Sequence, residues 1–251
     1  MAELTAARIG LGRTGASAPT RAVLDFALDA ARARDAVVRP ADFITLGAAL
    51  RDRGFATLAV DSAAPDRLTY LARPDLGRRL SAESRLRLAT IAPPLAPDLA
   101  IVAADGLSSR ALDHVPSLLD ALAPHIAKRN WVLAPVVLAS QARVALGDEV
   151  GALVNARMVL VLVGERPGLS SPDSLGAYLT YAPCAGRTDA ERNCVSNIRP
   201  AGLLPAHAAI KLAWLMDEAL RLQLTGVALK DESSTDPMLL VKPALSTGPA
   251  T

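Results

Sequence analysis

The segment VLVLVGERPGLSSPDS, residues 159–174, joins five consecutive aliphatic residues to a glycine, a glutamate, an arginine and a proline. A strand at the surface of a sheet alternates apolar and polar residues, whereas this run is apolar at every position. The pattern predicts a central strand that is covered on both faces. In open α/β sheets, ligands bind in the crevice beyond the carboxyl ends of such strands. Glu165 therefore follows the strand at a position suited to ligand binding.

The loop Gly164–Gly168 has two interpretations. In the first it is a tight turn in which Glu165 and Arg166 are simply solvated. In the second it is a rigid ligand-binding loop, because Pro167 fixes its own φ and restricts Arg166, while the glycines allow close approach. The rigidity favours a carboxylate held to accept hydrogen bonds from amide N–H groups of a ligand.

Apolar strand patterns and helical patterns alternate from residue 98 onward. Strands are predicted at LAIVAADG (99–106), WVLAPVVLAS (131–140), MVLVLVG (158–164) and LGAYLTYAP (175–183), and a long helix at 205–224. This alternation predicts an α/β fold: a Rossmann-like, largely parallel sheet with helices on both faces. We assign that domain to residues 98–251, after a mostly helical N-terminal region and linker, residues 1–97, which ends in the proline-rich APPLAPD.

Several residues are expected at the starts of helices. Thr20, Asp42 and Ser81 are expected to cap helices, and Leu24 and Leu28 lie on one face of the first of these. Asp105 and Ser108 are candidates to cap a helix after the first strand of the sheet. Pro116 lies within the helical pattern that follows, so we expect a kink or two helices in tandem. In GRTDAERNCVSNI, residues 186–198, the polar side chains suit turn caps or ligand contacts equally.

Composition excludes several classes of function. Of the 251 residues 51% are hydrophobic and 21% charged, which is typical of a folded globular protein. Only 3% are aromatic, the net charge is +2 and no basic stripe stands out, so we expect no nucleic-acid partner. There is no apolar run of membrane-spanning length and no signal-peptide segment, so we expect a cytosolic protein without a membrane contact. Cys184, Cys194 and the three scattered histidines predict neither a disulfide framework nor a metal site.

GLGRTG, residues 10–15, matches the dinucleotide-binding motif G-x-G-x-x-G. The motif is informative only between a strand and a helix, with an acidic residue at the end of the next strand. Here the preceding segment is short and Asp35 lies within a helical pattern, so a glycine-rich arm is favoured. An NAD-dependent oxidoreductase that uses this segment stays as an alternative, as does a non-catalytic α/β binding module. No G-x-S-x-G elbow is present, which disfavours a serine hydrolase.

Six segments together resemble the small (light) subunit of ethanolamine ammonia-lyase, in that family's order and over residues 7–232. They are ARIGLGRTG, RARDAV, YLARPDLGRRL, IVAADGLSS, VLVGERPGLSSPDSL and GRTDAERNCVSNI. The resemblance implies an enzyme that converts ethanolamine to acetaldehyde and ammonia by a radical route with adenosylcobalamin. It implies that a large TIM-barrel subunit carries the substrate and its surrounding residues. This chain would then supply no catalytic residue, but a Rossmann-like domain that covers part of the cobalamin at the interface of a hetero-oligomer.

Three positions carry over from the family's corrinoid contacts: Val144, Glu165 and Cys194, with Arg143 as a weaker addition. Where the family has glycine before Arg143, this chain has Ala142. No Asp-x-His-x-x-Gly motif is present, and Asp113-His114 has the wrong spacing. We therefore expect cobalt to keep the cofactor's own benzimidazole as its lower ligand. We expect the enzyme in the cytosol, either free or within a bacterial microcompartment.

Overall fold

The computed structural model describes residues 11–90 and 95–233. Its strands are β1 (Thr57–Asp61), β2 (Leu99–Ala104), β3 (Val136–Ser140), β4 (Met158–Gly164), β5 (Leu175–Tyr181) and β6 (Asn193–Ile198). Its α-helices are α1 (Thr20–Val38), α2 (Phe43–Arg51), α3 (Arg67–Ala72), α4 (Ala82–Thr90), α5 (Val115–Lys128), α6 (Leu146–Leu153) and α7 (Pro205–Leu222). Short 3-10 helices are η1 (Leu76–Arg78), η2 (Ser109–His114), η3 (Asp189–Glu191) and η4 (Gly226–Ala228).

The strands form one sheet in the order β1-β3-β2-β4-β5-β6. The pairs β1–β3, β3–β2 and β2–β4 are parallel, whereas β4–β5 and β5–β6 are antiparallel. The α/β class is confirmed, but the sheet is mixed, and the prediction of a largely parallel, Rossmann-like sheet is not. The cause lies in the connections: residues 165–174 and 182–192 contain no α-helix, and parallel neighbours need a longer crossover that is usually helical.

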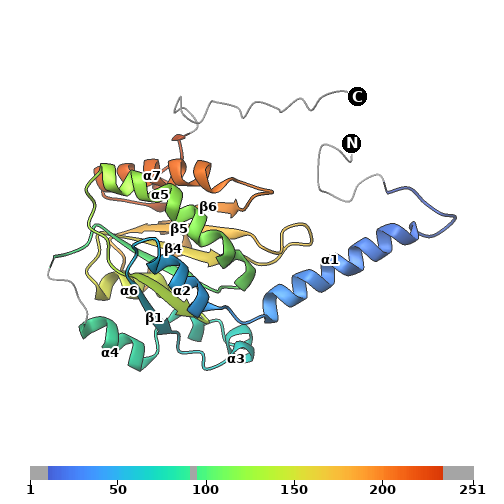
Figure 1. Cartoon of the computed structure of the whole chain (residues 1–251), viewed down its shortest axis with the longest axis horizontal. Helices are drawn as coiled ribbons and strands as arrows, with labels where there is room; N and C mark the ends of the chain where they lie inside the picture. The colour runs from blue at the N-terminus through green and yellow to red at the C-terminus, as the bar shows by residue number, and fades with distance from the viewer. Residues whose placement is uncertain (1–10, 91–94, 234–251) are drawn as a thin grey trace.

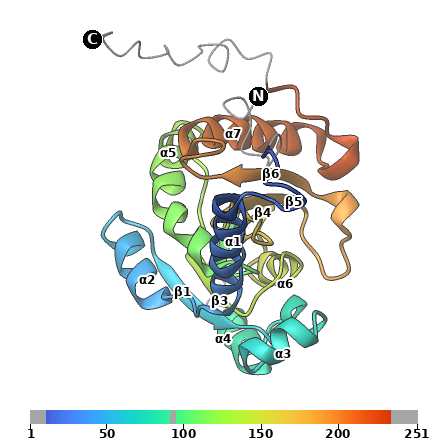
Figure 2. The ribbon, with the colours of Figure 1, turned by 90° about the vertical axis from the view of Figure 1, so that its right-hand side faces the viewer.

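The central strand β4 is buried at every residue, as the sequence predicts. Met158, Leu160 and Leu162 belong to a core cluster with α2, α5 and α7, while Val159, Val161 and Val163 belong to a second cluster with α4 and α6. Helices therefore cover both faces of the sheet, and Figure 2 shows α5 and α7 on one side and α6 on the other. The first cluster extends to β5 and β6, but the second contains no buried residue from either strand.

The N-terminal region contributes to the same sheet, because β1 pairs with β3 over five residues. A division of the chain at residue 97 stays a prediction. Helix α1 projects from the body (Figure 1), and Ala36 is its one buried residue. The predicted apolar face of α1 is open, with Leu24 63% and Leu28 49% exposed.

Two of the three predicted helix caps are confirmed. The Asp42 carboxylate accepts a hydrogen bond from Thr45 N and the Ser81 hydroxyl accepts one from Ser84 N. The Thr20 prediction was wrong, because Thr20 is already the first residue of α1 and Pro19 precedes it without a side-chain cap. Pro116 lies in the first turn of α5, directly after η2, which confirms the two helices in tandem. Strand β6 was missed, because polar residues mask its pattern.

Candidate functional site

The carboxyl ends of β2, β3 and β4 meet where the strand order reverses, since β3 and β4 flank β2 on opposite sides. Loops that follow such strands diverge and leave a crevice between them. A cavity of about 440 Å³ lies at this position and is lined by all three loops. We call it the edge cavity; its lining includes Gly106, Leu107, Arg143, Val144, Glu165 and Tyr178.

The loop after β2 holds the loop after β3 in place through Asp105. This buried carboxylate accepts hydrogen bonds from the backbone N–H groups of Gln141, at 3.1 Å, and Ala142, at 3.0 Å. Desolvation raises the pKa of Asp105, against the effect of these donors and of Arg67. The sequence offers Asp105 and Ser108 as helix caps, but neither side chain caps η2. The Ser108 hydroxyl instead donates to Pro172 O at 2.6 Å.

The loops after β2 and β4 touch through two glycines. Gly106 has a φ of +55°, and Leu107 N donates to Gly164 O at 2.9 Å. A Cβ on Gly106 would lie 2.2 Å from Gly164 O, and one on Gly164 would lie 2.0 Å from Ser108 O. The close approach therefore requires glycine at both positions, and it fixes the backbone position of Glu165, the next residue after Gly164.

Glu165 is half-buried, and its two carboxylate oxygens differ in their surroundings. Oε2 accepts hydrogen bonds from the Ser174 hydroxyl and, at 3.3 Å, from Asn197 N. Oε1 has no hydrogen-bond donor among the described residues, although it lies where a Cβ on Gly176 would approach it to 2.9 Å. One oxygen thus orients the side chain, and the other is available to a ligand that donates N–H groups.

Tyr70 forms the floor beneath Arg143. The tyrosine is fully buried, and the Arg143 and Arg67 guanidinium carbons lie 4.7 and 4.8 Å from its ring centroid. Burial raises the pKa of Tyr70 to about 12, so its hydroxyl stays neutral in ordinary buffers. Cation–π contacts of this kind orient the Arg143 side chain, whose backbone N also donates to Gly77 O at 2.8 Å.

Cys194 lies in β6 directly opposite Tyr178 of β5, on the face of the sheet that carries the second core cluster, against which Tyr178 packs. It is exposed, but desolvation of the thiol and the nearby Glu165 carboxylate raise its pKa, and its hydrogen bond with Tyr178 opposes them. Desolvation is also the main cause that raises the pKa of Tyr178. Of the predicted site residues, Arg143, Val144 and Glu165 line the edge cavity, and Cys194 adjoins it through Tyr178.

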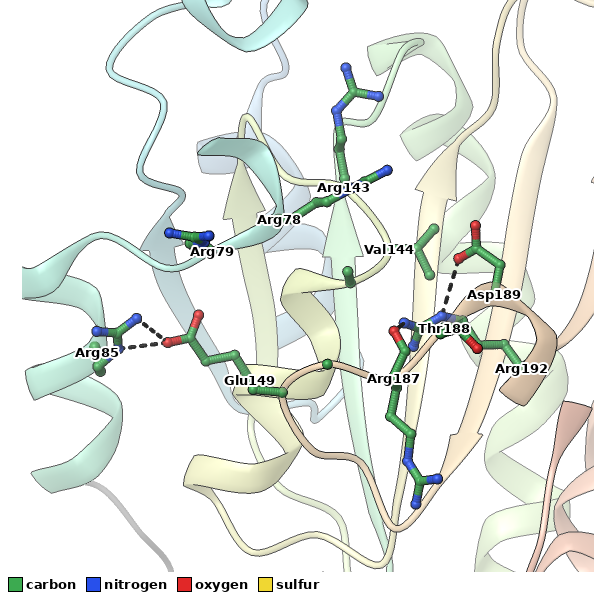
Figure 3. Close-up of a pocket in the computed structure, with 13 residues that line it drawn as sticks. Arg78, Arg79, Arg85, Arg143, Val144, Glu149, Arg187, Thr188, Asp189 and Arg192 are labelled. Atoms are coloured by element: carbon green, nitrogen blue, oxygen red, sulfur yellow. Dashed lines mark hydrogen bonds and ion pairs between the residues drawn. The ribbon is translucent and has the colours of Figure 1, made fainter. Parts of the chain in front are cut away.

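A second cavity, of about 880 Å³, continues from the first, and Arg143 and Val144 line both. We call it the arginine cavity; its arginines are Arg78, Arg79, Arg85, Arg143, Arg187 and Arg192. Figure 3 shows Arg78 and Arg143 on one side of it, with Arg85 paired to Glu149 and Arg187 directed away. The walls come from η1, the β3–α6 loop and the β5–β6 connection, so residues far apart in sequence form this cavity.

A capping box in η3 stabilises the β5–β6 connection, and its contribution to stability should depend on pH. The Glu191 carboxylate accepts from Thr188 N at 2.8 Å and pairs with Arg187, and these contacts lower its pKa from 4.5 to about 2. Because the folded pKa is depressed, the stabilisation is complete above about pH 4.5 and is lost as the pH falls toward 2.

We expect the stability difference between wild type and Glu191→Gln, measured by urea unfolding, to be constant above pH 5 and to shrink between pH 4.5 and 2. A difference that does not change with pH would show that the Glu191 carboxylate is not held in this way.

No helix of the described residues is both long and apolar enough to cross a membrane. Within residues 11–90 and 95–233, no cluster of three or more His, Cys, Asp or Glu side chains could hold a metal ion. His114 Nε2 lies 3.1 Å from Asp173 Oδ2 and does not line the edge cavity.

Comparison with known proteins assigns the chain to a family. Residues 1–230 match the family model described as ethanolamine ammonia-lyase light chain (EutC). The chain belongs to the ethanolamine ammonia-lyase light chain family. It is 57% identical to the ethanolamine ammonia-lyase small subunit of Rhodopseudomonas palustris, over 92% of this chain and 88% of that protein. It is 53% identical to the one of Xanthomonas campestris pv. campestris, over 98% of this chain and 91% of that protein. Family membership confirms the resemblance and makes this chain the small subunit of an ammonia-lyase.

The light-chain assignment leaves GLGRTG without a dinucleotide role. Gly10 lies outside the described residues, Gly12 is exposed, and Gly15 lies in an exposed turn between Thr14 and Ser17. The segment that leads into α1 lies away from the sheet (Figure 1). Sequence reasoning missed Tyr70, Asp105 as a positioning residue, and Tyr178. The period-two pattern of LGAYLTYAP placed Tyr178 in a strand, but nothing in it indicated which face of the sheet Tyr178 occupies.

Proposed function

We propose that this small subunit acts with a large subunit as an adenosylcobalamin-dependent ethanolamine ammonia-lyase, which converts ethanolamine to acetaldehyde and ammonia. In this proposal the edge cavity closes part of the cofactor site at the interface between the subunits. The observation that carries it is the free Oε1 of Glu165 beside Val144 in one open cavity, at the carboxyl edge of the sheet. Light-chain family membership supports the reaction and the partner.

The residues of the edge cavity fit the chemistry of a corrin. A corrin ring has broad apolar faces and a rim of amide side chains, which donate hydrogen bonds. Glu165 Oε1 suits the rim amides, while Val144 and Leu107 offer apolar contact. Cys194 and Tyr178 extend the surface along β5 and β6, on the face where the second core cluster includes no buried residue of either strand.

When bound, adenosylcobalamin supplies the radical chemistry, and the protein contributes placement and seclusion. The residues of this chain contribute only to placement and seclusion of the cofactor. Asp105 positions the loop that carries Arg143 and Val144, and Ser174 orients Glu165. The neutral Cys194 thiol and Tyr178 hydroxyl add surface without adding charge, because the pKa of each is raised.

The exposed apolar face of α1 supports assembly with the large subunit. Covering a solvent-exposed leucine with a partner protein stabilises the complex, by about 1.5–3 kcal/mol for each side chain that becomes fully buried. We expect Leu24→Ser/Leu28→Ser to weaken association of the purified chain with the large subunit, measured by sedimentation. The urea unfolding transition of the isolated chain should stay the same, since neither leucine is buried.

Arg34→Ser, on a different face of α1, serves as the control and should leave association unchanged. If the double variant assembles as tightly as wild type, α1 does not contact the large subunit.

The proposed function is tested by reconstitution. The chain alone should show no ammonia-lyase turnover, and the chain with its large subunit and adenosylcobalamin should release acetaldehyde and ammonia from ethanolamine. Full turnover by the large subunit without this chain, or turnover without the cofactor, would contradict the proposal.

A further inference from the structure

The arginine cavity carries a positive charge that the protein itself does not neutralise. Six arginines line it against two acidic residues, Glu149 and Asp189. Such an excess in a concave site attracts anions, because the walls concentrate the field of the charges.

Three of the arginines are already neutralised. Arg85 pairs with Glu149, Arg187 pairs with Glu191, and Arg192 forms an ion pair with Asp148 in which each side chain is 1% exposed. These three stabilise the walls, and none is available for a ligand without breaking an ion pair.

The other three have no carboxylate within ion-pair distance among the described residues. Arg78 and Arg79 are exposed at the end of η1. Arg143 stacks on Tyr70, and its Nε is buried without an acceptor. Since Arg143 N is bonded to Gly77 O, the segment with Arg78 and the segment with Arg143 are adjacent. Three guanidinium groups that line one cavity without a carboxylate partner are suited to a phosphate, which accepts paired hydrogen bonds from arginine.

We propose that Arg78, Arg79 and Arg143 bind the phosphodiester of the cofactor's nucleotide tail. This inference rests on the proposed function, because it places the corrin in the edge cavity. The two cavities share Arg143 and Val144, so a ligand with an apolar disc and an anionic tail meets the matching surface in each. Glu165 accepts hydrogen bonds from the amides of the corrin rim, and the arginines pair with the negatively charged phosphodiester of the tail.

The test is equilibrium binding to the assembled complex of both subunits, followed by the absorption change of the corrinoid. Three ligands separate the groups: adenosylcobalamin, adenosylcobinamide phosphate, which keeps a phosphate but lacks the base, and adenosylcobinamide, which lacks both. We expect Arg78→Gln/Arg79→Gln to raise the Kd of the two phosphate-containing ligands about 10- to 100-fold, and to leave the Kd of adenosylcobinamide unchanged.

Two further variants serve as controls. Arg73→Gln removes a nearby arginine that is paired with Asp75 and does not line the cavity, and it should change no Kd. Arg78→Lys/Arg79→Lys keeps the charge but not the paired hydrogen bonds, so it should restore part of the affinity, which separates the effect from misfolding.

Three results would overturn the inference. Equal weakening of all three ligands would show that the arginines do not act on the phosphate. Weaker subunit assembly with an unchanged Kd for adenosylcobalamin would assign the cavity to acidic residues of the large subunit. Binding of inorganic phosphate that the Gln variant loses, again with an unchanged cofactor Kd, would assign it to free phosphate.

Failure of the proposed function would look different, because the wild-type complex would then bind none of the three corrinoids.

Discussion

Gly164→Ala is expected to destabilise the folded chain by about 3 kcal/mol, a large effect for the addition of one methyl group. The added Cβ would lie 2.0 Å from Ser108 O and 2.6 Å from Asp105 O, and neither backbone oxygen can rotate away. To relieve this contact the loop after β2 must separate from the end of β4, which opens the edge cavity. Urea unfolding of wild type and variant measures the difference.

Gly168→Ala is the matched control in the same loop. Its Cβ would approach only the Ser171 hydroxyl, at 2.8 Å, and that small side chain can turn to another rotamer. We expect a loss well below that of Gly164→Ala. Equal stabilities for both variants would contradict the close contact between the loops after β2 and β4.

Glu165→Gln is expected to raise the Kd of adenosylcobalamin for the assembled complex by about tenfold. The substitution keeps the shape of the side chain but removes its charge, and hydrogen bonds to a charged group contribute about 1.5–3 kcal/mol against about 1 for neutral pairs. Glu165→Ala should weaken binding further, since it also removes the acceptor and frees Ser174.

Glu218→Gln on α7 is the control, because Glu218 pairs with Arg221 on a helix of the opposite face of the sheet. If Glu165→Gln lowers stability without a change in cofactor affinity, Glu165 is structural and its assignment to the cofactor fails.

The sequence was sufficient to predict the central part of the fold. In β4 every residue is apolar, and the glycine, proline and glutamate that follow mark its end, so the position of Glu165 followed from local pattern alone. The direction of β5 was not predicted, although residues 165–174 carried the signal: a loop rich in Gly, Pro and Ser has no helix to return the chain for a parallel strand.

The sequence predicts only those residues of the candidate site that directly follow a recognisable strand. Val144 and Glu165 follow apolar strands, and both line the edge cavity. The local sequence around Asp105 suggests only a helix cap. Its actual hydrogen bonds reach residues 36 and 37 positions away, and no local pattern reveals such partners. The arginine cavity is likewise not visible in any local pattern, since its arginines without an ion pair come from the end of η1 and from the loop after β3.

We propose that the loops after β2, β3 and β4 form part of the adenosylcobalamin site. Hydrogen–deuterium exchange of the assembled complex, with and without the cofactor, measures this directly. We predict slower exchange of amides in residues 105–108, 141–145 and 165–174 when adenosylcobalamin is present, and no change in α5 and α7, which lie on the opposite face. Unchanged exchange in all three loops, in a complex that binds the cofactor, would show that these loops do not form part of its site.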